Sequence, residues 1–148
     1  MEAIIFCGIQ ATGKSTFYKK RFFNTHVRLS LDLLKTRNRE RKFMETCFNT
    51  QQAFVVDNTN PSKAERTIYI SLAKTNNYKI IGYYFQSKIV EALARNSQRE
   101  GKELIPEKGI KGTFNRLEMP GFEEGFDELY YVELTTEGFN IKEWTNEI

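Results

Sequence analysis

The chain has few of the residues from which metal centres and disulfide frameworks are built. Its 148 residues include two cysteines, Cys7 and Cys47, and a single histidine, His26. Because no C-x-x-C pair and no Cys/His cluster occurs, the sequence argues against a structural zinc site. Two thiols in a chain of this length fit a reducing compartment, so we expect a cytoplasmic protein.

Long apolar runs are also absent. The first apolar run, residues 3–7, is too short to cross a membrane and follows Glu2 rather than a basic segment. It indicates a core strand, not a signal peptide, and we expect no membrane contact. The net charge of +3 is compatible with a polyanionic substrate but does not identify one. The length predicts a single domain over residues 1–148.

What the chain does have is a phosphate-binding pattern near its start. Residues 8–15 read Gly-Ile-Gln-Ala-Thr-Gly-Lys-Ser and match G-x-x-x-x-G-K-[ST] at every fixed position. With a strand before it and a helix after it, such a loop forms a nest of backbone N–H groups for a polyphosphate. Lys14 would reach the β- and γ-phosphates, and Ser15 would bind Mg²⁺. The residues expected to contact the nucleotide are Gly8, Gln10, Ala11, Thr12, Gly13, Lys14, Ser15 and Thr16.

Strand and helix patterns alternate along the chain. We expect strands over 3–7, 27–29, 53–57, 78–85 and 127–134, and helices over 14–23, 31–51 with a break at 35–38, 61–76, 88–99 and 113–118. This alternation predicts an α/β fold of the P-loop NTPase type, a three-layer α/β/α sandwich around a mostly parallel five-stranded sheet. Residues 88–118 are expected to form a small helical lid, with a mobile loop at 100–112. The tail from 135 to 148 has no assigned element, although Trp144 suggests that it docks on something.

Two carboxylates are expected where strands end, at the sheet edge that binds ligands in such folds. Asp57 ends the third strand, where a carboxylate can hold Mg²⁺, but the turn-forming residues around it also allow a capping role. Asp32 follows the second strand and can accept the proton of an acceptor hydroxyl, or only favour the first turn of a helix. Asn58 and Asn60 either orient the nucleotide or acceptor, or cap local structure.

Basic residues offer two further candidates. Arg95 and Arg99 are four residues apart, so on one helix face they could contact the transferred phosphate from the lid, or they could simply be solvated. The basic run from Lys35 to Lys42 could line a groove for an acceptor, although a solvated helix face is the ordinary alternative.

Taken together, these segments resemble the kinase domain of 5′-hydroxyl polynucleotide kinases from phage and animals. The likeness rests on the phosphate loop, on Leu-Ser-Leu-Asp-Leu-Leu-Lys at 29–35, on Val-Val-Asp-Asn-Thr-Asn-Pro at 55–61, and on Arg-Asn-Ser-Gln-Arg at 95–99 with Ile-Pro at 105–106. The resemblance implies ATP and Mg²⁺ as cofactors and Asp32 as general base, with Lys14 and Arg99 in catalysis and Arg95 also on the phosphates.

The resemblance also implies an acceptor, the 5′ end of single-stranded RNA or DNA. Lys35 stands where the phage enzyme has an arginine implied to bind the acceptor's phosphate, and Ser30-Leu31 replace the usual Asn-Arg. Lysine keeps the charge but loses the bidentate fork. These departures leave two other functions open. One is a small-molecule kinase for a sugar, nucleoside or other metabolite, and the other is a non-enzymatic ATP-binding module.

Overall fold

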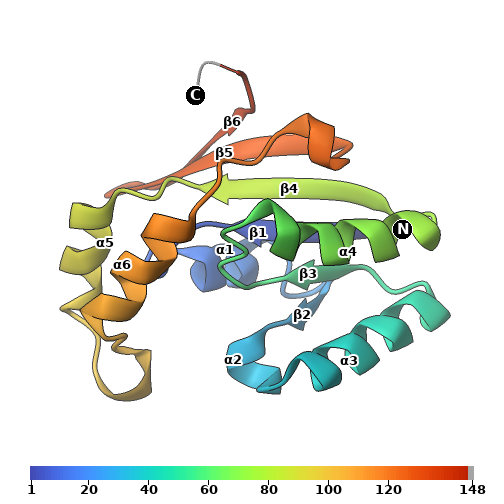
Figure 1. The fold of residues 1–148 in the computed structure, drawn as a ribbon, viewed down its shortest axis with the longest axis horizontal. Coiled ribbons are helices and arrows are strands. Elements are labelled where there is room, and N and C mark those ends of the chain that lie inside the picture. The colour runs from blue at the N-terminus through green and yellow to red at the C-terminus, as the bar shows by residue number, and fades with distance from the viewer. Residues whose placement is uncertain (147–148) are drawn as a thin grey trace.

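The computed structural model describes residues 1–146 and contains one mixed sheet with the strand order β2-β3-β1-β4-β5-β6. Neighbouring strands are parallel from β2 across to β5, and β6 alone runs antiparallel, beside β5 (Figure 1). The mostly parallel sheet is therefore confirmed, but the predicted count of five strands is wrong by one within the described residues. The strands are β1 (Glu2–Cys7), β2 (Val27–Leu29), β3 (Phe54–Val56), β4 (Lys79–Phe85), β5 (Glu128–Thr135) and β6 (Gly138–Glu143).

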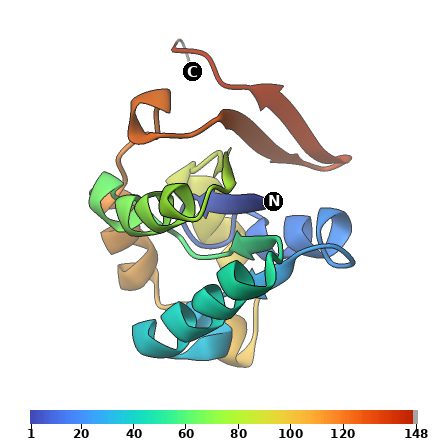
Figure 2. The ribbon, with the colours of Figure 1, turned by 90° about the vertical axis from the view of Figure 1, so that its right-hand side faces the viewer.

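Helices cover both faces of this sheet, which confirms the three-layer prediction. α1 packs on one face and α3 and α4 pack on the other (Figure 2). α5 and α6 pack on each other and on the loop that follows β1. The helices are α1 (Lys14–Arg21), α2 (Leu31–Leu34), α3 (Arg37–Thr50), α4 (Lys63–Thr75), α5 (Ile89–Asn96) and α6 (Glu107–Arg116), with short 3₁₀ turns η1 (Gly101–Glu103) and η2 (Phe122–Glu124).

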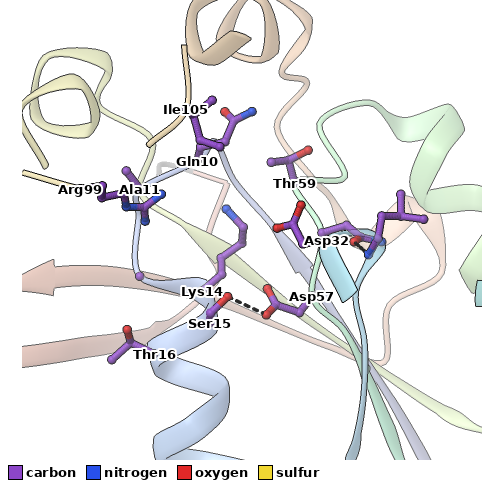
Figure 3. Close-up of a pocket in the computed structure, with 13 residues that line it drawn as sticks. Gln10, Ala11, Lys14, Ser15, Thr16, Asp32, Asp57, Thr59, Arg99 and Ile105 are labelled. Carbon is purple, nitrogen blue, oxygen red and sulfur yellow. Dashed lines mark hydrogen bonds between the residues drawn. The ribbon is translucent and has the colours of Figure 1, made fainter. Parts of the chain in front are cut away.

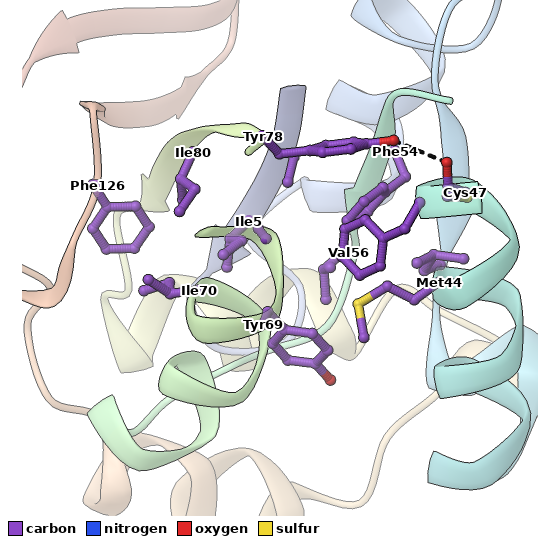
Figure 4. Packing of buried hydrophobic residues seen from close by; sticks show 14 of the residues in the cluster. Ile5, Met44, Cys47, Phe54, Val56, Tyr69, Ile70, Tyr78, Ile80 and Phe126 are labelled. Atoms are coloured by element: carbon purple, nitrogen blue, oxygen red, sulfur yellow. Dashed lines mark hydrogen bonds between the residues drawn. The ribbon is translucent and has the colours of Figure 1, made fainter. Parts of the chain in front are cut away.

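The core follows from the alternation of side chains along the strands. On β1, Ala3 and Ile5 face α3 and α4, whereas Ile4 and Phe6 face α1. Figure 4 shows the cluster under α3 and α4, which is larger than the cluster under α1. In it, Tyr69 and Tyr78 pack among aliphatic and aromatic side chains. Because β1, β3 and β4 are buried on both faces, the carboxyl ends of the parallel strands are left for a ligand.

The largest differences from the predicted helix boundaries are at the end of α5 and the start of α6. α5 ends at Asn96, so Arg99 lies beyond the helix and does not share a helix face with Arg95. The helix ends there because the Asn96 side chain closes the following loop, donating to the Ile105 carbonyl at 2.6 Å and accepting from its N–H at 2.9 Å. α6 then begins at Glu107, within the expected loop and six residues before position 113.

The last strand brings the C-terminal part of the chain against the sheet. After a turn at Gly138, where φ is 123°, β6 places Phe139 over Phe17 with ring centroids 5.1 Å apart. Trp144 packs edge-on against Tyr84 at 5.7 Å, so the expected docking of Trp144 is confirmed. Within the described residues, no helix is both long and apolar enough to pass through a membrane.

Candidate active site

The loop between β1 and α1 has the backbone conformation that its glycines allow. Gly13 and Ala11 have φ values of 92° and 62°, in the left-handed region that glycine adopts freely. A Cβ at Gly8 would lie 2.9 Å from the Phe85 carbonyl oxygen, and one at Gly13 would lie 2.9 Å from the Phe139 ring. These two positions therefore require glycine for different reasons, close packing on β4 and close packing under β6.

Lys14 lies across this loop as a buried cation. Its Nζ donates to the carbonyl oxygens of Gly8 at 2.8 Å and Ile9 at 2.6 Å, and the side chain faces the pocket described next. Burial lowers the pKa of Lys14 from 10.5 to about 8, because the charged ammonium loses hydration. An anion bound in the pocket would stabilise the charged Lys14 ammonium in place of the water that burial removes.

A pocket of about 330 Å³ opens at the ends of β1, β2 and β3 (Figure 3). It brings together Lys14, Asp32, Asp57 and Arg99, four candidates that lie far apart in the sequence. The lining residues are Gln10, Ala11, Gly13, Lys14, Ser15, Thr16, Leu31, Asp32, Asp57, Asn58, Thr59, Arg99 and Ile105. Gly8 and Thr12 support the loop from behind. The Gly8 N–H donates to the Thr59 carbonyl, and the Thr12 hydroxyl donates to that of Ile9.

Ser15 and Asp57 meet on the floor of the pocket. The Ser15 hydroxyl donates to Asp57 Oδ2 at 3.0 Å, and Arg28 Nε donates to the same oxygen at 2.8 Å. The Asp57 side chain is only 2% exposed. A hydroxyl and a carboxylate at this edge are the hard oxygen ligands that Mg²⁺ prefers, so the residues present fit this metal.

Asp32 lies in the single-turn helix α2, whose first amide is held from outside the helix. Asn58 Oδ1 accepts from the Leu31 N–H at 2.8 Å, while Asn58 Nδ2 donates to Glu40 Oε2 at 2.8 Å. The Tyr69 hydroxyl donates to the other Glu40 oxygen at 2.6 Å. Asn58 therefore has the capping position considered above, and it links α2 to α3 and α4.

Glu40 is a buried carboxylate, 3% exposed, and depends on these partners. Arg37 Nη1 lies 3.5 Å from Glu40 Oε1 and also donates to the Tyr69 hydroxyl. Burial raises the pKa of Tyr69, and its hydrogen bond to the Glu40 carboxylate raises it further. We call Asn58, Glu40 and Tyr69 the anchoring network of α2.

Of the other residues predicted for the site, some line the pocket and others lie outside it. Arg99 lines the pocket, whereas Arg95 donates to the Ala11 carbonyl at 3.2 Å and pairs with Glu91 at 3.5 Å. Lys35 is exposed and is not among the lining residues. Asn60 is 2% exposed, and its amide donates to the Phe6 carbonyl at 2.7 Å. Its contacts are therefore those of a structural residue that joins the turn after β3 to β1, the capping alternative considered above.

Some residues of the site were not identified from the sequence. Thr59 and Ile105 line the pocket, and Arg28 contacts both Ser15 and Asp57. The signal for Arg28 is a charged residue inside a predicted apolar strand. For Glu40 the signal is equally local, a single acidic residue within the basic run from Lys35 to Lys42.

Comparison with known sequences finds relatives among kinases. The chain is 28% identical over 88% of its length to a bifunctional polynucleotide phosphatase/kinase of Schizosaccharomyces pombe, and spans 33% of that protein. It is 36% identical over 52% of its length to a putative enzyme of the same description from Acanthamoeba polyphaga mimivirus, and spans 18% of it. An L-seryl-tRNA(Sec) kinase of Methanococcus maripaludis is 25% identical over 98% of the chain, which spans 64% of that relative. No protein-family model matches the chain.

Solved structures agree with this fold. A sugar kinase from Janibacter superposes with a TM-score of 0.68 at 12% identity, with 88% of this chain and 85% of that chain covered. Chaetomium thermophilum Kti12, solved with ADP-AlF3, gives 0.62 at 15% identity, with 88% of both chains covered. At such identities the likeness concerns the fold alone. The chain therefore has the fold of P-loop kinases, and its sequence resembles that of polynucleotide phosphatase/kinases.

Proposed function

We propose that this chain transfers the γ-phosphoryl group of ATP to a hydroxyl, and that the acceptor is the 5′-hydroxyl of RNA or DNA. The observation that carries this proposal is the single pocket lined by Lys14, Asp32, Asp57 and Arg99. Each of these charged groups corresponds to a requirement of phosphoryl transfer, which depends on positioning and on stabilising charge.

The phosphate loop would bind the triphosphate through its backbone N–H groups and Lys14. Asp32 would accept the proton of the acceptor hydroxyl as its oxygen bonds to the γ-phosphorus, while the bond from the γ-phosphorus to the bridging oxygen breaks and ADP leaves. Arg99 would stabilise charge on the transferred group. Ser15 and Asp57 would hold Mg²⁺, which when bound neutralises negative charge on the phosphates.

A lid is part of the same proposal. Residues 88–118 form α5, η1 and α6, and they carry Arg99 and Ile105 to the rim of the pocket. Buried Ala92 and Ile110 pack on Ile9 and Ala11 of the phosphate loop. The pocket wall formed by this segment could thus respond to nucleotide binding.

The names of the sequence relatives support a nucleic acid as the acceptor. The names of two relatives describe a polynucleotide phosphatase/kinase, and a third is named L-seryl-tRNA(Sec) kinase. We therefore place a nucleic acid before a sugar or another metabolite as the acceptor class. A nucleic-acid acceptor also fits the exposed basic run beside α2, from Lys35 to Lys42.

The test is transfer of labelled γ-phosphate from ATP to 5′-hydroxyl oligonucleotides of RNA and DNA, with nucleosides and sugars in parallel. We expect labelled oligonucleotide, and a loss of about 100-fold or more in Asp32→Asn with ATP affinity nearly unchanged. Glu45→Gln, which neutralises an exposed carboxylate of α3, serves as the matched control. Label on small molecules alone would contradict the nucleic-acid acceptor, and full activity in Asp32→Asn would remove Asp32 as the base.

A further inference from the structure

Arg28 is a third member of the Ser15–Asp57 pair, and the proposed function gives it no role. Its Nε donates to Asp57 Oδ2 at 2.8 Å and its Nη2 donates to Ser15 Oγ at 3.1 Å. Since Ser15 Oγ also donates to Asp57 Oδ2, the three side chains form a closed triangle. A guanidinium therefore contacts both of the residues that fit a divalent cation.

The register of the sheet, and not a loop, sets the position of Arg28. On β2, Leu29 faces the cluster under α3 and α4, so Arg28 points to the opposite face, where α1 begins. Leu29 pairs with Val56 in the parallel ladder, and the Asp57 N–H donates to the Leu29 carbonyl at 2.8 Å. Arg28 and Asp57 are thus held side by side by main-chain hydrogen bonds.

These contacts use Ser15 Oγ and Asp57 Oδ2, two of the oxygens that a metal at this site would bind. A hydroxyl has one hydrogen and two lone pairs. In Ser15 the hydrogen goes to Asp57, and one lone pair accepts from Arg28. The ion pair is partly shielded from water, because the Arg28 and Asp57 side chains are 27% and 2% exposed. A charge-assisted bond in such a setting is strong, and a second cation at the same oxygens would be repelled.

We propose that Arg28 is a resident counter-cation that competes with Mg²⁺ for Ser15 and Asp57. The free metal then binds weakly, and it enters the site together with a triphosphate, whose oxygens supply the further ligands that Mg²⁺ requires. Arg28 would in this way couple metal binding to nucleotide binding. The proposal rests on the proposed function only for the assignment of Ser15 and Asp57 to the metal.

The test measures Mn²⁺ binding in the absence of nucleotide, by the electron paramagnetic resonance signal of the free ion. Arg28→Gln keeps much of the side-chain length but removes the charge, so we expect it to bind Mn²⁺ about tenfold tighter than the unaltered protein. Arg21→Gln removes the same charge from the exposed end of α1 and should leave the affinity unchanged. If Arg28→Gln binds Mn²⁺ no tighter than Arg21→Gln does, the proposal is overturned.

A double variant locates the metal. Arg28→Gln combined with Asp57→Asn should lose the gain in affinity, and tight Mn²⁺ binding by this variant would place the ion elsewhere and overturn the proposal. If Arg28→Gln does not fold by circular dichroism, Arg28→Met replaces it, because methionine keeps much of the side-chain length and also removes the charge. Tighter Mn²⁺ binding is again expected, and unchanged binding would contradict the competition.

The outcome is separate from that of the transfer assay, because no turnover is measured. If Mn²⁺ binds in the expected pattern but no acceptor is labelled, the proposed function fails and the competition at Ser15 and Asp57 stands. If oligonucleotides are labelled but Arg28→Gln binds Mn²⁺ no tighter than Arg21→Gln does, only the proposed competition fails.

Discussion

Lys14 illustrates how burial makes a binding residue sensitive to pH. Burial lowers its pKa to about 8, and its Nζ contacts the Gly8 and Ile9 carbonyls. A polyphosphate bound at the proposed site would favour the protonated ammonium, so the complex would hold this proton more tightly than the free protein does. The effect of this proton on folding stability has the opposite dependence on pH. The unfolded chain binds the proton more tightly, so Lys14 contributes increasing stability as the pH rises from about 8 to 10.5.

We therefore expect ATP affinity to fall as the pH rises through about 8, because Lys14 of the free protein then loses its proton. The slope should approach about tenfold per pH unit above that value, one proton being taken up on binding. Binding of a fluorescent ATP analogue between pH 7 and pH 9.5 measures the slope. Lys14→Arg stays charged over this range, so a slope of the same size in that variant would assign the effect to another group.

For single residues, the motif at 8–15 predicted the loop between a strand and a helix that the structure shows between β1 and α1, and the nucleotide contacts of its residues stay a prediction. Arg28 and Glu40 were not predicted as site residues. Their roles depend on partners that are 29 and 18 residues away, Asp57 and Asn58, and no local pattern encodes such pairs.

Among the elements, α2 depends most on its surroundings. A helix of four residues has little stability of its own, and its N-cap residue Ser30 makes no side-chain capping bond. Its position, and with it that of Asp32, is set by the anchoring network of Asn58, Glu40 and Tyr69.

Removal of the Tyr69 hydroxyl should therefore reduce turnover without reducing ATP affinity. We expect Tyr69→Phe to lower kcat about tenfold, because a small displacement of the base is costly to transfer. Tyr78→Phe is a matched control from the same cluster (Figure 4), since this buried hydroxyl donates only to the Cys47 and Gln52 carbonyls. It should cost about 1 kcal/mol of stability and leave kcat unchanged.

Steady-state kinetics and denaturant unfolding of both variants distinguish positioning from general packing. Equal kcat values in the two variants, or a tenfold rise in KM for ATP in Tyr69→Phe alone, would show that the network does not act through α2.

The sequence predicted most strands and helices, and its errors have identifiable causes. α6 was expected to begin at 113 because Gly109 and Gly112 weaken the local helix signal, although Pro106 and Glu107 mark its actual start. β6 was not predicted because most of its residues are exposed at one edge of the sheet, so it lacks the apolar run of a central strand.

For the whole molecule, Arg66 joins segments that are distant in the sequence. This arginine is fully buried and forms a two-point ion pair with Glu124 of η2, at 2.8 and 3.2 Å. It also donates to the carbonyl oxygens of Asn60, Pro61 and Glu118. One side chain thus fixes α4, the turn after β3 and the segment after α6 relative to one another.

We expect Arg66→Met to lower the free energy of unfolding by about 3–5 kcal/mol, since it leaves the Glu124 carboxylate buried without its partner. Lys63 lies on the same helix as Arg66, and Lys63→Met, which breaks the exposed ion pair between Lys63 and Glu123, should cost no more than about 1 kcal/mol. Urea denaturation of the two variants measures both values. A loss in Arg66→Met as small as that in Lys63→Met would mean that the buried pair contributes little.

The packing of Phe139 over Gly13 and Phe17 has a consequence for how the protein is made. The loop between β1 and α1 is synthesised before the ring that packs against it, because Phe139 follows Gly13 by more than a hundred residues. A nascent chain therefore holds this loop without its full support until the hairpin of β5 and β6 has formed.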